Sequence, residues 1–176
     1  MSAGETEQQT TSKRTKKKGE PPVTLLLRLR RTDETALATN GELEIVARPD
    51  LPPPPPRFLT VEKPWLGNAP SVSRIPPKTF YRLYRQQSAL WDREVLVVVS
   101  AVANSKSRSV KGREDEEIAI IPTRDIKDVP NGSIGIVEKH TGPGTGYAPD
   151  TPFASCIQVV FAALDRGERV LLEIRS

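Results

Sequence analysis

Alternating apolar and polar residues recur along the chain in short runs and predict β-strands. In residues 23–31, leucine occupies every second position from Leu25 while Arg28 and Arg30 lie between, which is the period of a strand with one buried face. Residues 95–99 are apolar without a break, a pattern typical of a strand covered on both faces. The predicted strands cover residues 23–31, 42–48, 79–86, 91–103, 117–121, 133–138, 156–163 and 168–175.

Turns and proline-rich links separate these strands. Asn40–Gly41 predicts a tight turn, and the run Pro52–Pro56 makes residues 49–78 an irregular, extended segment. Three glycines and three prolines in residues 141–152 predict a further stretch without regular structure. About eight short strands with little helix and no internal repeat indicate an all-β fold. The expected architecture is an antiparallel jelly-roll sandwich, formed by a body at residues 23–176.

The positive charge of the chain is concentrated at its beginning. The 176 residues carry a formal net charge of +4, and residues 1–31 alone hold eight Lys and Arg against three Glu. Residues 1–22 are polar and cannot bury enough apolar surface to order themselves, so they predict a disordered arm. The basic side chains of this arm that can neutralise RNA phosphates are Lys13, Arg14, Lys16, Lys17 and Lys18. A solubilising tail or a nuclear-import signal is the alternative for so short a basic run.

Residue types needed for catalysis or metal binding are scarce. His140 is the only histidine and Cys156 the only cysteine, so neither an imidazole metal cluster nor a Cys-His pair is expected. We expect His140 to be exposed in a polar turn and Cys156 to be an inert thiol inside an apolar strand. The loop Gly142–Gly146 lacks the spacing of a phosphate loop, and Pro149 and Pro152 argue against a helix after it. The chain is therefore not expected to be an enzyme, to hold a cofactor or to bind a small-molecule substrate.

A charged segment, residues 106–117, joins two predicted strands and has two interpretations. Its basic residues are Lys106, Arg108, Lys111 and Arg113, and its acidic residues are Glu114, Asp115, Glu116 and Glu117. A solvated loop whose opposite charges compensate locally is the simpler interpretation. Alternatively, the basic half contacts nucleic acid or a neighbouring subunit, and the acidic half meets a basic patch or holds a divalent cation at a subunit interface.

The aromatic and basic residues of segment 80–85 also allow two interpretations. In a strand, one face carries Phe80, Arg82 and Tyr84, and the other carries Tyr81, Leu83 and Arg85. Such side chains can stack on the bases of single-stranded nucleic acid. Because neither face is purely aromatic, packing against the body with arginine at the rim is the favoured interpretation.

Two stretches of the chain are similar to segments of a known family. Residues 96–106, LVVVSAVANSK, are similar to a central strand and loop, and Phe161–Leu164 followed by GERVLLEI at 167–174 resembles a closing hairpin. The family they resemble is the bromovirus-type coat proteins of small icosahedral positive-strand RNA plant viruses. The chain departs from that pattern in its proline-rich segment 49–77 and in an arm with fewer arginines. The resemblance implies a jelly-roll subunit that self-assembles into a shell around single-stranded RNA.

Three classes of function account for these features to different degrees. The leading hypothesis is a viral coat protein, a many-copy homo-oligomer that packages a single-stranded RNA genome and is found in the virion, and in the host cytoplasm during assembly. The alternative is a non-capsid viral RNA-binding protein, such as a movement protein or silencing suppressor. It would act as a monomer or dimer and gather basic and aromatic residues on a folded face. An enzyme is the third hypothesis. No apolar run approaches the roughly 18 residues of a membrane span, so no membrane partner is expected.

Overall fold

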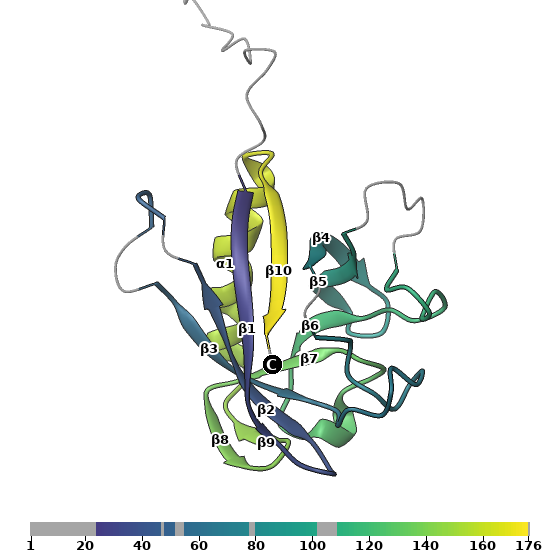
Figure 1. Ribbon diagram of the computed structural model, residues 1–176. Helices are drawn as coiled ribbons and strands as arrows, with labels where there is room; N and C mark the ends of the chain where they lie inside the picture. The colour runs from purple at the N-terminus through teal and green to yellow at the C-terminus, as the bar shows by residue number, and fades with distance from the viewer. Residues whose placement is uncertain (1–23, 47, 52–54, 78–79, 102–108, 176) are drawn as a thin grey trace, which may run out of the picture.

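Eight strands closed into a barrel form the body of the structure, a computed structural model that describes residues 24–46, 48–51, 55–77, 80–101 and 109–175 (Figure 1). The barrel strands are β1 (Thr24–Glu34), β2 (Thr39–Ile45), β3 (Arg57–Glu62), β4 (Phe80–Ser88), β5 (Arg93–Ser100), β6 (Ala119–Pro122), β7 (Ile134–Val137) and β10 (Arg169–Arg175). Outside the barrel are the 3-10 turn η1 (Ile126–Asp128), the hairpin strands β8 (Lys139–Gly142) and β9 (Thr145–Tyr147), and the helix α1 (Asp150–Asp165). The order around the barrel is β1-β10-β4-β5-β6-β7-β3-β2.

Alternation of apolar residues places one face of each strand inside the barrel. In β1, Leu25, Leu27 and Leu29 are buried, and Leu27 lies opposite the buried Leu172 of β10. The residues between them, such as Arg28, therefore point outward. These strands bear out the expected all-β class.

Strand β5 is buried on both faces, as the unbroken run at 95–99 predicts. Leu96 and Val98 belong to the main core inside the barrel. Val97 faces the other way, into a second apolar cluster that includes Ile121 and Val129. This second cluster covers the outer surface of β5 and β6.

The expectation of a wholly antiparallel sheet is wrong at two pairings. Strand β10 runs parallel to β1, and β7 runs parallel to β6. Parallel neighbours need a crossing connection instead of a tight turn. Residues 123–133, which include η1, provide one between β6 and β7, and α1 delivers the chain to β10 beside β1.

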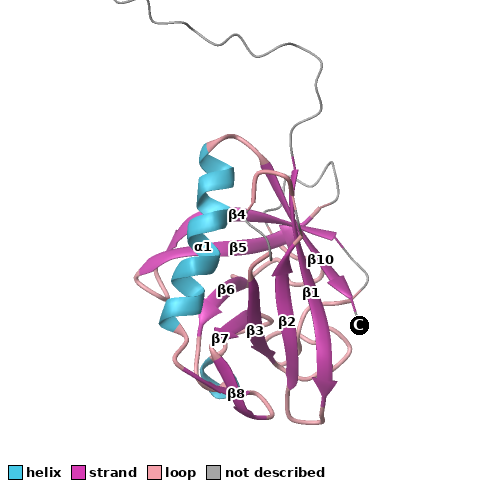
Figure 2. Ribbon diagram, turned by 90° about the vertical axis from the view of Figure 1, so that its left-hand side faces the viewer, coloured by secondary structure: helices cyan, strands magenta, loops and turns pink. Residues whose placement is uncertain are grey.

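Helix α1 occupies residues that were expected to form a strand at 156–163. Its buried residues recur at the three- and four-residue spacing of a helix face and are Phe153, Cys156, Val160 and Ala163. This face packs into the main core, against β10 and β7 among other strands (Figure 2). No helix within the described ranges is long and apolar enough to cross a membrane.

The ends of α1 explain why the prolines before it do not prevent a helix. Pro152 lies in the first turn, where a backbone N–H has no partner within the helix, so proline costs no hydrogen bond there. At the other end Gly167 has a φ of 77°, and the Glu168 N–H donates to the Ala163 carbonyl at 3.1 Å. This is the usual glycine-terminated end of a helix.

Two segments expected to be irregular contain strands. Strand β3 lies within residues 49–78, and β8, β9 and the start of α1 overlap residues 141–152. After β3, residues 63–77 follow an irregular path that buried arginines fasten to the barrel. Arg31 donates to both carboxylate oxygens of Glu62 at 2.9 and 2.8 Å, and also to the Ile75 carbonyl at 2.9 Å.

Candidate nucleic-acid interface

The basic residues predicted to bind RNA are only partly within the described residues. The arm residues Lys13 to Lys18 lie outside them, as do Lys106 and Arg108. Lys111 is exposed on the turn that follows. Arg113 is buried, pairs with Glu116 and donates from Nη1 to the Ser73 carbonyl at 2.7 Å. The second basic patch predicted from the sequence therefore does not include Arg113, which anchors the turn instead.

The four acidic residues that follow have separate surroundings. Glu114 accepts from the backbone N–H of Gly112 at 2.8 Å. Glu116 pairs with Arg113, while Glu117 accepts from Ser88 Oγ at 2.6 Å. Asp115 is exposed. In the described part of the chain, no three or more His, Cys, Asp or Glu side chains are placed to hold a metal ion.

The single cysteine and histidine are not grouped for catalysis. Cys156 is fully buried in α1, and this burial raises the pKa of its thiol to about 12. The expected burial of this thiol is confirmed, although its element is a helix and not a strand. His140 is half-buried, not exposed as expected, and its Nε2 lies 3.0 Å from the Thr60 carbonyl oxygen.

Strand β4 separates its aromatic residues between two faces. Tyr81 and Leu83 point into the core, whereas Arg82 lies over the ring of Tyr84 on the outer face, 5.3 Å from its centre. Tyr84 packs on the second apolar cluster. Phe80, at the start of the strand, stays 49% exposed. Packing thus accounts for most of this stretch, and Phe80 is the aromatic side chain that it leaves open to solvent.

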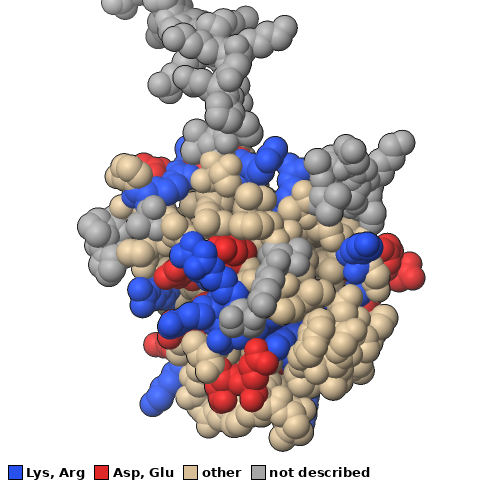
Figure 3. Space-filling view, in the orientation of Figure 1, with Lys and Arg blue, Asp and Glu red and all other residues tan. Residues whose placement is uncertain are grey.

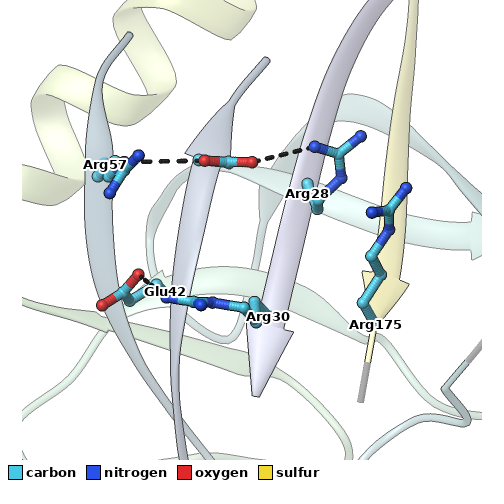
Figure 4. Close-up of a pocket in the computed structure, with 6 residues that line it drawn as sticks. Arg28, Arg30, Glu42, Arg57 and Arg175 are labelled. Carbon is cyan, nitrogen blue, oxygen red and sulfur yellow. Dashed lines mark hydrogen bonds and ion pairs between the residues drawn. The ribbon is translucent and has the colours of Figure 1, made fainter. Parts of the chain in front are cut away.

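A group of charged residues that was not predicted from the sequence as a site lies on the outer surface of β10, β1, β2 and β3. We call it the arginine hollow; it has a volume of about 290 Å³ and is lined by Arg28, Arg30, Glu42, Glu44, Arg57 and Arg175. Figure 4 shows Arg28 and Arg57 pointing toward the glutamate between them, and Arg30 pointing toward Glu42 and away from Arg175. In Figure 3, blue and red side chains mix on this face of the molecule.

Strand register brings these residues together in two adjacent rows. In the first row Arg28 lies between Glu173 of β10 and Glu44 of β2, with contacts of 2.8 Å to Glu173 Oε2 and 3.1 Å to Glu44 Oε1. Glu44 in turn faces Arg57 of β3, whose Nε is 3.7 Å from Glu44 Oε2. The hydrogen bond from Arg28 lowers the pKa of Glu173, so this carboxylate stays ionised at neutral pH.

The second row has an unfavourable pair at its centre. Arg30 of β1 lies directly opposite Arg175 of β10 in the parallel ladder. Like charges at opposed positions of a sheet repel each other. Each arginine has one glutamate neighbour, since Arg30 contacts Glu42 at 2.9 Å and Arg175 contacts Glu173 at 2.9 Å.

The hollow keeps an excess of positive charge that faces solvent. Its four arginines outnumber the three glutamates that contact them by one. The side chains of Arg30, Arg57 and Arg175 are 64%, 65% and 55% exposed, whereas that of Arg28 is 26% exposed. Three guanidinium groups are therefore free to donate further hydrogen bonds to an anion such as phosphate.

The sequence pattern alone indicates half of the residues that line the arginine hollow. The outward positions of the first and last strands are occupied by Arg28, Arg30 and Arg175. Their convergence depends on the pairing of β1 with β10, which no local pattern reveals. Arg57 was assigned to an irregular segment, so its outward direction was not predicted.

Comparison with protein-family models, with curated proteins and with solved structures finds no match to this chain. The likeness to bromovirus-type coat proteins stays a prediction from the sequence.

Proposed function

We propose that this protein binds single-stranded RNA, and that the folded barrel takes part in binding together with the basic arm. The observation that carries the proposal is the opposed pair Arg30 and Arg175. Their strand positions are opposed, so an anion bound beside both arginines reduces the repulsion between their like charges. Arginine is suited to this task because its planar group donates two parallel hydrogen bonds to phosphate.

The width of the hollow favours a polymer over a small anion. Arg175, Arg30 and Arg57 extend from β10, β1 and β3, with β2 between the last two. Three strand spacings of about 4.8 Å separate β10 from β3, a span of about 14 Å. One phosphate group cannot contact both ends, whereas successive phosphates of a nucleic-acid chain can.

The glutamates limit how strongly the hollow alone can bind. Glu42, Glu44 and Glu173 hold the arginines in position and offset most of their charge. Attraction to phosphate from such a surface is modest and falls with salt. In this proposal the arm residues Lys13 to Lys18 supply most of the non-specific attraction, and the hollow orients the RNA on the barrel.

A coat subunit is the second candidate function, and exposed apolar residues favour it. Trp65, Leu66 and Val72 are 42%, 50% and 49% exposed on the link that follows β3. Apolar side chains clustered on a surface are typical of protein–protein contacts. In this candidate the subunits associate through such contacts into a shell in the virion, with the arms directed toward the RNA. Its jelly-roll form would divide the strands between two packed sheets, and the parallel pairings of β1 with β10 and of β6 with β7 lend that form no support.

Removal of residues 1–22 separates the two candidates. If the barrel takes part in binding, the shortened chain keeps measurable affinity for RNA at low salt. The slope of log affinity against log salt then falls by about 3.5, since five arm charges contribute about 0.7 each. The coat-protein candidate predicts instead that most binding disappears and that the full chain with RNA forms large particles in electron micrographs. Loss of all binding in a chain that remains folded would refute the role proposed for the barrel.

A further inference from the structure

A mainly apolar pocket of about 450 Å³ opens where β4 begins, next to the arginine hollow. Its walls include Phe80, Tyr81 and Val110, and its polar lining includes Asn68 and Lys111. This volume lies within the range of about 300–1,000 Å³ that small-molecule sites occupy. Apolar walls with a few polar groups are also typical of such sites.

The aromatic walls of the pocket differ in how freely they can contact a ligand. The Tyr81 hydroxyl donates to the Pro76 carbonyl at 3.0 Å, which holds its buried ring in place. Phe80 is half-exposed, so its ring offers a face on which a planar group can stack. Base–aromatic stacking of this kind is a common mode of single-strand recognition.

The side-chain amide of Asn68 adds a polar group to the mainly apolar walls of the pocket. Its Oδ1 is buried and has no hydrogen-bond partner. Asn68 has a φ of 62°, and its Nδ2 lies 3.7 Å from the position that a Cβ on Gly112 would take. A carboxamide presents a donor and an acceptor side by side, which is the pattern that pairs with the edge of a base.

The pocket and the arginine hollow are adjacent across one strand pairing. Phe80 of β4 lies opposite Glu173 of β10, and Glu173 accepts from both Arg28 and Arg175. The distance between paired strands is about 4.8 Å. A nucleotide whose phosphate contacts Arg175 therefore has its base within reach of Phe80, and the exposed Lys111 is available for a neighbouring phosphate.

We propose that this pocket binds one unstacked nucleobase of a single-stranded RNA, with Phe80 stacking on the base and Asn68 pairing with its edge. The inference rests on the proposed function, because the arginine hollow has to hold the backbone. It selects single strands over duplexes, since the bases of a duplex are stacked and paired inside the helix.

The test compares a short single-stranded RNA with an abasic ribose–phosphate chain of equal length, each titrated against the full chain. The intact RNA should bind about 5- to 150-fold more tightly, which is the range measured for one stacked base. Phe80→Leu should remove this advantage for the RNA and leave the affinity for the abasic chain unchanged. Phe80→Tyr, which keeps an aromatic ring, should retain the advantage. Tyr147→Leu removes an exposed aromatic residue outside the pocket and serves as the matched control.

The possible results distinguish base binding in the pocket from phosphate binding at the arginine hollow. Equal affinities of the wild-type chain for both ligands, with no effect of Phe80→Leu, would overturn the base pocket and leave the phosphate-binding function intact. Failure to bind either ligand would overturn the proposed function and this inference with it. Asn68→Ala gives a second measurement at a different wall of the pocket, and it should weaken binding of the RNA alone. Because Phe80 is half-exposed, its substitution should leave the thermal unfolding midpoint near that of the wild type.

Discussion

Neutralising the exposed arginines of the hollow should change how RNA binding responds to salt. The variant combines Arg30→Gln, Arg57→Gln and Arg175→Gln, which keep polar side chains but remove three positive charges. Each phosphate contact on a single strand contributes about 0.7 to the slope of log affinity against log salt. If all three arginines contact phosphate, the slope becomes shallower by about 2. Over a fourfold change in salt, this corresponds to an about 16-fold smaller loss of affinity.

Fluorescence anisotropy with a labelled single-stranded RNA at several salt concentrations measures this slope. A matched variant removes the same charge from exposed residues that do not line the hollow, by Arg124→Gln, Lys127→Gln and Lys139→Gln. We expect the slope of this control to stay close to that of the wild type. Equal changes of slope in both variants would show that net charge alone acts, and the role of the hollow would then be refuted.

Substitution of a glutamate in the hollow should strengthen RNA binding, whereas substitution of the arginines should weaken it. Glu42 contacts Arg30 at 2.9 Å and offsets its charge. Glu42→Gln therefore frees Arg30 for phosphate and should tighten RNA binding at low salt. Exposed ion pairs of this kind contribute about 0–1 kcal/mol to stability, so the thermal unfolding midpoint should change little.

The remaining predictions concern the stability and reactivity of the barrel. Glu62→Gln should lower the free energy of unfolding by about 3–5 kcal/mol in urea titrations, because Arg31 stays charged and buried without its partner; a loss below about 1 kcal/mol would contradict this. The pKa of Cys156 is raised to about 12 by burial, so its thiol should react with a disulfide reagent only as fast as the protein unfolds. A rapid reaction of the folded protein would disprove the burial. The pKa of Glu173 is lowered from 4.5, chiefly by the hydrogen bond from Arg28. Its stabilising effect is fully present above the ordinary pKa and is lost as pH falls through the folded one, so the stability difference between wild type and Glu173→Gln should stay constant from neutral pH down to about 4.5 and shrink below it. A difference that does not shrink at the lower pH would rule out this linkage.

Local alternation was enough to predict most of the strands. The inward leucines of β1 and the apolar run of β5 lie where the sequence places them, and both are buried as expected. The helix was missed because the apolar stretch at 156–163 includes β-branched residues and follows two prolines. Its three- and four-residue spacing of buried positions was the signal that could have found it.

The candidate site depends on information that the sequence does not carry locally. Arg30 and Arg175 are far apart in the chain and meet only because β1 and β10 pair when the barrel closes. Arg113 belongs to a basic stretch, yet its side chain is buried by the link around Ser73. Residue type therefore indicated RNA binding in general, whereas register and burial decide which arginines are available to phosphate.

Arginine-specific chemical footprinting can show directly whether bound RNA contacts the barrel surface. The full chain is treated with phenylglyoxal with and without single-stranded RNA, and the modified residues are quantified by mass spectrometry. We expect RNA to protect Arg30, Arg57 and Arg175, while the exposed Arg124 reacts equally in both samples. If RNA leaves the reaction of these three arginines unchanged although it is bound, the barrel surface is not part of the RNA-binding site.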